Sequence, residues 1–198
     1  GARMSETPIQ VLDYDPAWPE AFAAERERLR PWVGEHASRI EHVGSTSVPG
    51  LAAKPIVDIT AVVTDVEGLW GNLDKLAEFL DYRVSHHPGD WLFLQRADGE
   101  DDGSGRGGDG QPFNLHLVPE SNDAWRRDLL FREYLREHPD PRAEYADAKR
   151  EAAAAHPDDL EAYNDAKADV CTEIMDRALA DDDVVVPPPG EPGGDAEH

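Results

Sequence analysis

Apolar residues recur along the chain at two spacings, which predict helices and strands. Apolar positions three and four residues apart predict helices over 16–33, 66–80, 124–137, 142–155 and 158–180. Short apolar or alternating runs predict strands over 38–43, 56–63, 82–85, 91–96 and 113–118. This order predicts an α+β fold, in which a mixed β-sheet is backed by helices and residues 119–180 form a C-terminal helical part.

Three segments have compositions that disfavour packing. Residues 97–112 are rich in glycine and aspartate, which predicts a mobile loop, and their acids do not match the twelve-residue calcium-binding pattern. Residues 181–198 combine acids, prolines and glycines, which predicts a disordered tail. Residues 1–8 are interpreted as an N-terminal arm whose first three residues are an expression remnant. A single domain is therefore expected over 9–180.

The composition of the chain limits which binding partners and which cellular compartment are expected. The chain has 42 acidic and 19 basic residues and a formal charge of −23, which argues against nucleic acid and anionic membranes as partners. The acidic surface is otherwise interpreted as ordinary solvation, or as adaptation to a salty environment. One cysteine, Cys171, no long apolar run and no signal peptide predict a cytoplasmic protein, and Cys171 is interpreted as a core residue.

The stretch 40–59, I-E-H-V-G-S-T-S-V-P-G-L-A-A-K-P-I-V-D-I, is the densest group of candidate functional residues. A strand ends at Gly44, and Ser45, Thr46 and Ser47 follow as three consecutive hydroxyl residues at the start of a short helix. Hydroxyls and free backbone N–H groups at such a position suit a phosphate. The alternative is that these residues only cap the helix.

Two charged residues follow in the same stretch. Asp58 interrupts an apolar strand, where a lone carboxylate is unfavourable to bury without a partner or a metal. It is a candidate metal ligand, or it merely accepts backbone hydrogen bonds in the turn. Lys54 precedes Pro55, which favours an extended approach to the strand. Lys54 is thus a candidate phosphate ligand, with a surface position as the alternative.

The later strand 113–118 alternates strictly. Asn114, His116 and Val118 should face one side of the sheet and the residues between them the other. His116 is either a metal ligand or base, or a core histidine with ordinary partners.

These motifs together resemble the GrpB family, also called UPF0157. The resemblance rests on the stretch 41–59, on L-D-Y-D-P-A-W-P-E-A-F near the start, on N-L-H-L-V at 114–118, and on the later W-R-R-D-L-L-F-R-E-Y-L-R and Y-A-D-A-K-R. It covers roughly residues 9 to 180. The family is placed in the nucleotidyltransferase superfamily, whose fold resembles that of DNA polymerase beta, so the resemblance implies the same α+β arrangement.

The resemblance also implies a pattern of metal ligands. The superfamily has Gly-Ser, then a strand with two acids one residue apart, then a third acid on a later strand. Gly44-Ser45 and Asp58 match, whereas Thr60 stands at the second acid and His116 on the later strand. The family often has His-x-His there, and this chain has Asn114 at the first position. One divalent metal is therefore expected rather than two.

The expected ligands of that metal are Asp58, His116 and one residue of the facing strand. Glu41 and His42 point to opposite sides of that strand, and His42 is the preferred ligand. Magnesium or manganese is the expected metal, and imidazole ligands favour manganese, zinc or iron over magnesium.

The resemblance implies transfer of a nucleoside monophosphate from a nucleoside triphosphate to a small-molecule acceptor. Lys54, Lys149 and Lys167 would bind the phosphates. Other helical residues that recur in the family either line the mouth of the site or form ordinary helix surface: Arg132, Tyr134, Tyr145 and Tyr163. The alternative function is a non-catalytic nucleotide- or metabolite-binding protein with a degenerate transferase site. A third hypothesis is that the acidic loop and tail bind a partner.

Overall fold

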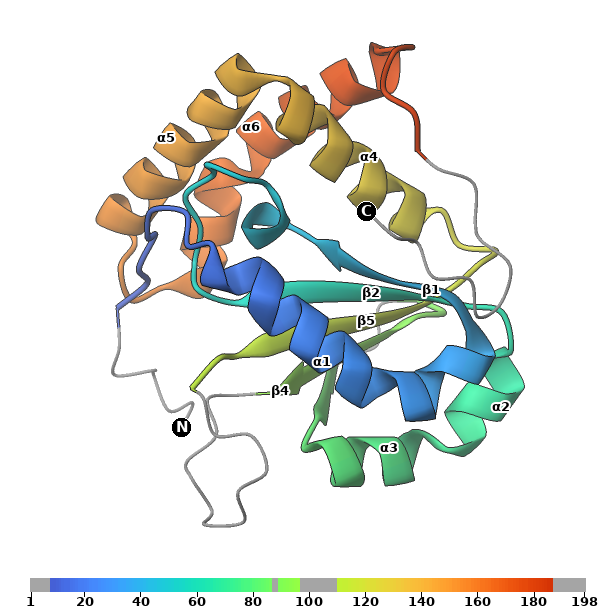
Figure 1. The fold of residues 1–198 in the computed structure, drawn as a ribbon. Helices are drawn as coiled ribbons and strands as arrows, with labels where there is room; N and C mark the ends of the chain where they lie inside the picture. The colour runs from blue at the N-terminus through green and yellow to red at the C-terminus, as the bar shows by residue number, and fades with distance from the viewer. Residues whose placement is uncertain (1–7, 87–88, 97–109, 187–198) are drawn as a thin grey trace.

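The computed structural model describes residues 8–86, 89–96 and 110–186 (Figure 1). Its helices are α1 (Ala17–Val33), α2 (Val66–Gly71), α3 (Leu73–Leu80), α4 (Ala124–Glu137), α5 (Pro139–Ala155) and α6 (Leu160–Ala180), with 3-10 turns η1 (Gly34–His36) and η2 (Ser45–Ser47). Its strands are β1 (Ala37–Val43), β2 (Val57–Val63), β3 (Arg83–His86), β4 (Leu92–Arg96) and β5 (Phe113–Pro119).

The strands form one mixed sheet in the order β1-β2-β5-β4-β3. Strands β2 and β5 are parallel, and the other neighbours are antiparallel. This arrangement confirms the predicted α+β fold. The register aligns Asp58 with Val43 on one side and Asn114 on the other, and Thr60 with His116. Because paired residues share a face, these side chains emerge on the same side of the sheet.

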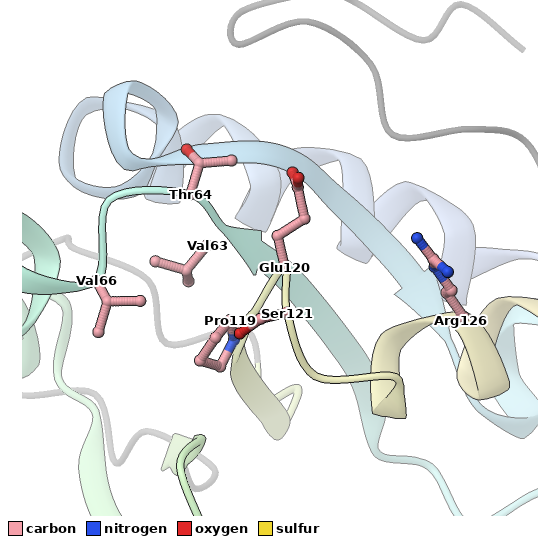
Figure 2. Close-up of a pocket in the computed structure, with 7 residues that line it drawn as sticks. All are labelled: Val63, Thr64, Val66, Pro119, Glu120, Ser121 and Arg126. Carbon is pink, nitrogen blue, oxygen red and sulfur yellow. The ribbon is translucent and has the colours of Figure 1, made fainter.

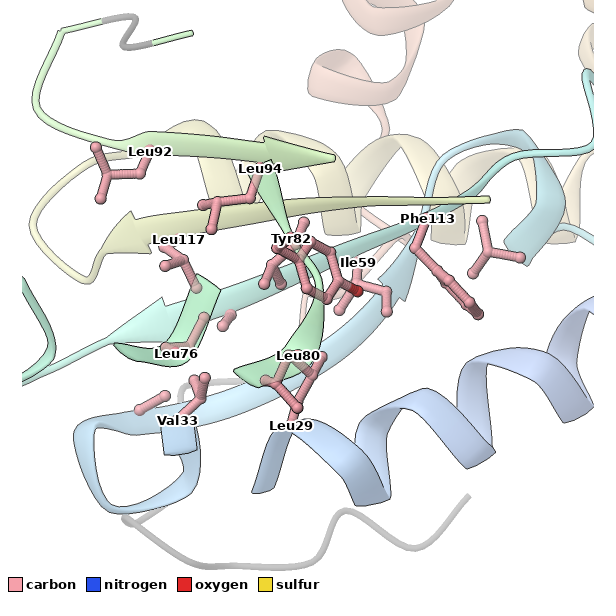
Figure 3. Packing of buried hydrophobic residues seen from close by; sticks show 14 of the residues in the cluster. Leu29, Val33, Ile59, Leu76, Leu80, Tyr82, Leu92, Leu94, Phe113 and Leu117 are labelled. Carbon is pink, nitrogen blue, oxygen red and sulfur yellow. The ribbon is translucent and has the colours of Figure 1, made fainter. Parts of the chain in front are cut away.

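Helices cover both faces of the sheet. Helices α1, α2 and α3 lie on one side, and α4, α5 and α6 lie on the other (Figure 1). The side of α1 and α3 holds the largest apolar cluster, in which Leu29, Ile59, Leu76, Leu80, Leu94 and Leu117 pack together (Figure 3). Burying each such side chain contributes about 1.5–3 kcal/mol. This cluster therefore provides most of the apolar stabilisation of the sheet.

The predicted helix over 66–80 is in fact two helices. The chain leaves the first helix at Asn72, with φ −109° and ψ 5°, after Gly71. The Asn72 side chain donates a hydrogen bond to the Gly68 carbonyl, so it competes with the helical backbone pattern. Asp65 caps the first helix, because its carboxylate accepts a hydrogen bond from the Gly68 N–H.

The C-terminal helices differ from the prediction at two boundaries. Helix α5 starts at Pro139 rather than at 142, because proline is well tolerated in the first turn. The predicted tail begins too early, since residues 181–186 are placed and Val184 is buried against α4, α5 and α6. Residues 1–7, 97–109 and 187–198, which include most of the predicted arm, loop and tail, lie outside the described residues.

Within the described ranges, none of the helices has the length and apolar character that crossing a bilayer requires.

Candidate functional site

Asp58 lies near the start of β2, on the face covered by α4 to α6. Its Oδ1 accepts a hydrogen bond of 3.0 Å from Asn114 Nδ2 and lies 3.7 Å from His116 Nε2. The Asp58 side chain is 30% exposed and that of His116 22% exposed, so a ligand could reach both. The structure therefore brings together Asp58 and His116, as the sequence predicted.

The loop after β1 approaches Asp58 so closely that it requires glycine. Gly44 has φ +71°, and a Cβ atom added there would lie 2.5 Å from Asp58 Oδ2. The positive φ disfavours other residues, and the contact would displace the carboxylate. Gly44 thus leaves room for Asp58 at this edge of the sheet.

The three hydroxyl residues after Gly44 form a single 3-10 turn with no side-chain cap. Thr46 and Ser47 are buried, and their hydroxyls bond to His42 Nε2 and to the Gly44 carbonyl. The Ser45 side chain forms a hydrogen bond with Tyr145. All three hydroxyls therefore have partners within the protein, and the role of this turn in binding phosphate stays a prediction.

His42 lies on the other face of the sheet. It pairs with Ile59 in the register, and its ring stacks on Phe22 of α1 at 4.9 Å. Burial lowers the pKa of His42 to about 4. The choice of His42 as a metal ligand was wrong, and Glu41 shares the face of Asp58. Glu41 is bound to Arg132 Nη1 at 2.9 Å.

Three lysines converge near Asp58. The Lys54 and Lys167 ammonium groups lie 5.2 and 5.0 Å from the centre of the Tyr163 ring. Lys149 Nζ lies 4.4 Å from the Tyr145 ring centre and donates a hydrogen bond to the Ala52 carbonyl. The chain has only four lysines, and the fourth, Lys75, is exposed on α3. Three quarters of the lysines therefore occur at one site.

Burial lowers the pKa values of all three lysines, and nearby positive charge adds to the shift of Lys149 and Lys54. Burial, together with the positive charges of Lys167, Arg150 and Lys54, lowers the pKa of Lys149 to about 7. The pKa of Lys54 is lowered by burial and by Lys167, whereas the negative charge of Asp58 opposes the shift. Asp58 also opposes the shift that burial causes in Lys167. The lysines and Asp58 thus belong to one electrostatic site.

Tyr163, on α6, lies between two of these cations. It is completely buried, and its hydroxyl has no hydrogen-bond partner among the described residues. Burial raises the pKa of this hydroxyl to about 12, so it remains a neutral donor. A buried hydroxyl without a partner is unfavourable, and a ligand oxygen would satisfy it.

Arginines of the helical part bind the loop that follows β1. Arg132 donates to the His42 carbonyl, Arg136 donates twice to the Ser47 carbonyl, and Arg142 donates to the Pro49 carbonyl. These bonds fix the loop against α4 and α5. Of the helical residues that were expected at the mouth of the site, Arg132 therefore has a structural role. Tyr134 lies elsewhere, stacked on His138 at 4.2 Å.

Asp128 is a candidate residue that the sequence reasoning missed. It lies on α4, and its Oδ2 accepts a hydrogen bond of 3.2 Å from Thr60 Oγ1. Burial raises the pKa of Asp128 to about 6, and the charge of Asp58 also raises it, whereas His116 and Thr60 oppose the shift. One signal was available, because Trp125, Asp128, Leu129 and Arg132 have the spacing of a core-facing helix stripe.

A cleft of about 350 Å³ lies beside Gly44 and Asp128, and its lining among the described residues includes neither Asp58 and His116 nor the three converging lysines. It is lined from the loop by Gly44, from α4 by Arg127, Asp128 and Phe131, and from α6 by Cys171, Thr172, Met175 and Asp176. Cys171 is half-buried: it packs against the apolar cluster of α4, α5 and α6, as predicted, and it also lines the cleft. A second hollow, of about 360 Å³, lies at the other end of β2, between Val63, Glu120 and Arg126 (Figure 2). It includes none of the predicted site residues.

The described side chains around Asp58 do not form a complete set of metal ligands. Among the described residues, no group of three or more His, Cys, Asp or Glu side chains is arranged to hold a metal ion. In addition, Asn114 directs its NH₂ group at Asp58 and its oxygen at Gln95 Nε2, 3.2 Å away. This arrangement does not fit a resident transition metal. Asp58 would have to hold a magnesium or manganese ion as a single carboxylate, and such an ion takes only one or two carboxylates where phosphate oxygens and water supply the other ligands.

Comparison with known proteins gives three informative similarities. A UPF0157 protein of Halalkalibacterium halodurans is 38% identical over 172 residues, which cover 87% of this chain and 83% of that protein. The crystal structure of the conserved protein GrpB from Enterococcus faecalis is 30% identical, with a TM-score of 0.69, and the match covers 86% of this chain and 99% of that chain. A dephospho-CoA kinase of Mycolicibacterium paratuberculosis is 28% identical over 172 residues, which cover 76% of this chain and 41% of that protein.

The family model of the GrpB protein matches residues 8–177. This range contains the sheet, the Asp58 loop, the cleft and nearly all of the helical part. The match agrees with the relatives above in both sequence and fold. The chain therefore belongs to the GrpB family.

Proposed function

We propose that this protein binds a nucleoside triphosphate with its divalent cation in the cleft beside Asp58, and transfers the nucleoside monophosphate to a small-molecule acceptor. The observation that carries the proposal is the convergence of Lys54, Lys149 and Lys167 beside that carboxylate. In a chain of formal charge −23, this cationic site is a local exception that favours an anionic ligand.

The phosphates would bind to the lysines. After burial, repulsion from Lys167 contributes to the lowered pKa values of Lys54 and Lys149, and this repulsion is unfavourable without a ligand. A triphosphate would offset this repulsion and would accept hydrogen bonds from the ammonium groups. The Tyr163 hydroxyl supplies a further donor between Lys54 and Lys167. The same groups would hold the leaving pyrophosphate after transfer.

Asp58 would hold the cation that accompanies the triphosphate. Such an ion neutralises charge on the phosphates and orients them for in-line displacement. His116 lies close enough to Asp58 to act as a base or as a further ligand. The cleft of about 350 Å³ has the size of a small-molecule site. A dephospho-CoA kinase that contains a region similar to this chain favours a substrate from nucleotide metabolism.

The lysine variants test the phosphate site. Each triphosphate is titrated calorimetrically with magnesium into the wild type and into Lys54→Gln and Lys167→Gln. Loss of one charged contact is expected to weaken binding about 10- to 100-fold. Lys75→Gln is the matched control, because it removes the same charge from an exposed position on α3. Equal affinity of all four proteins would contradict the proposal.

A non-catalytic binding protein is the second candidate. Thr60 at the position of an expected acid, and the Asn114 amide directed at Asp58, both favour it. Incubation with triphosphates labelled at the α-phosphate and a mixture of small-molecule acceptors separates the two candidates. Transfer of label to an acceptor supports the enzyme. Tight binding without transfer supports the binding protein.

A further inference from the structure

Thr60 stands two residues after Asp58 on the same face of β2, where the superfamily pattern has a second acid. It is buried, and it lies opposite His116 in the register. Its hydroxyl donates to Asp128 Oδ2 at 3.2 Å. Helix α4 therefore delivers a carboxylate to the position that the strand leaves without one.

Among the described residues, Asp128 takes part in no ion pair. It accepts one hydrogen bond from the Thr60 hydroxyl, and a positive charge on His116 favours its ionised form. The adjacent Arg127 lines the same cleft without pairing with it. A partly buried carboxylate with one hydroxyl partner is unfavourable without a compensating charge.

Asp128 lines the cleft, and Asp58 adjoins it at Gly44, which also lines the cleft and lies against the Asp58 carboxylate. The charges of Asp58 and His116 both act on Asp128. A cation placed in this part of the cleft would therefore be attracted by two carboxylates from different elements.

We infer that Asp128 is the second carboxylate of the nucleotide site and replaces the acid that is missing at position 60. It would contact, directly or through a water molecule, the divalent cation that accompanies the triphosphate. This inference rests on the proposed function, because it requires that cation to enter the cleft. It assigns the role to a helix residue, whereas the superfamily pattern places the corresponding acid on the strand.

The experiment removes the carboxylate from the helix with Asp128→Asn and introduces one on the strand with Thr60→Asp. Binding of manganese is followed by the electron paramagnetic resonance signal of the free ion, with ATP, GTP, CTP and UTP each present in turn. Asp128→Asn keeps an acceptor for Thr60 and is expected to weaken manganese binding about 10- to 100-fold. Adding Thr60→Asp to that variant is expected to restore a large part of the loss.

Asp123→Asn is the control, because Asp123 is exposed at the N-terminal cap of the same helix and lies near Arg126 rather than at Thr60. Wild-type affinity in Asp128→Asn would overturn the inference and leave the proposed function standing. The inference would also be overturned if the double variant Asp128→Asn/Thr60→Asp did not regain manganese binding. This result counts only if the double variant unfolds at the same temperature as the wild type. If the wild type itself binds no manganese with any triphosphate, the proposed function fails, and the inference fails with it.

Discussion

The two faces of the sheet use the same strands for different purposes. On β5, Phe113, Leu115 and Leu117 are buried in the apolar cluster under α1 and α3 (Figure 3). Asn114 and His116, which alternate with them, face α4 to α6 and contact Asp58. A shift of one residue in register would exchange the two sets. The apolar face therefore fixes the register on which the polar face depends.

The two faces also differ in what they contribute: the apolar face stabilises the fold, and the polar face carries the candidate functional groups. The apolar face contributes burial, and its charged residue Glu25 is compensated by Arg28 and Arg96 and accepts a bond from Tyr82. The polar face holds charges whose partners are incomplete, namely Asp128 and the converging lysines. Uncompensated charge is unfavourable for folding and favourable for binding an ion of opposite sign.

The largest effect is expected from Ile59, the neighbour of Asp58 that faces the apolar cluster. Ile59→Ala should reduce the free energy of unfolding by about 2–5 kcal/mol through the lost burial and the cavity left behind. Urea unfolding measures the loss, and calorimetry in the absence of urea measures triphosphate binding. We expect binding to stay within a few fold of the wild type. A larger loss of binding in a folded variant would show that the two faces are not separable.

Gly44 tests the contact between the loop and the polar face. Gly44→Ala combines a strained positive φ, about 1–2 kcal/mol, with a displaced Asp58 carboxylate. Gly50→Ala has a similar φ of +80°, but its Cβ would meet only Arg142 Nη1 at 3.4 Å. Chemical denaturation should give similar losses of stability for both variants, whereas calorimetry should show loss of triphosphate binding only for Gly44→Ala. Equal binding by the two would contradict the placement of Asp58 in the site.

Lys149 gives a smaller effect that depends on pH. Its pKa is about 7 in the folded protein and 10.5 ordinarily, so the unfolded chain binds more protons between these values. The free energy of unfolding should therefore rise with pH above 7, by about 2 kcal/mol up to pH 9. Lys149→Met should abolish this rise, which urea unfolding at each pH would detect.

The same residue predicts proton uptake on binding. An anion beside Lys149 would raise its pKa, so triphosphate binding near pH 8 should take up a proton. Calorimetry in buffers with different enthalpies of ionisation measures this uptake. Its absence in the wild type would place the anion away from Lys149.

The sequence predicted the strands of the sheet and the convergence of Asp58 with His116, because alternation and a polar residue in an apolar strand are local signals. The sequence did not predict which face of the sheet carries the His42 side chain. Alternation shows that residues 41 and 42 point to opposite sides, but which side holds Asp58 depends on the register between β1 and β2. Asp128 lies 68 positions after Thr60, and only tertiary packing of α4 brings them together.

The most direct test of the account is calorimetric titration of each nucleoside triphosphate, with and without magnesium or manganese, into the wild type and Asp58→Asn. Asparagine keeps the size of the side chain and its acceptor for Asn114, so the variant should fold. We predict that the wild type binds at least one triphosphate more tightly with the metal, and that Asp58→Asn loses the metal-dependent part. Metal-dependent binding that is unchanged in the folded variant would contradict the central claim that Asp58 holds the cation.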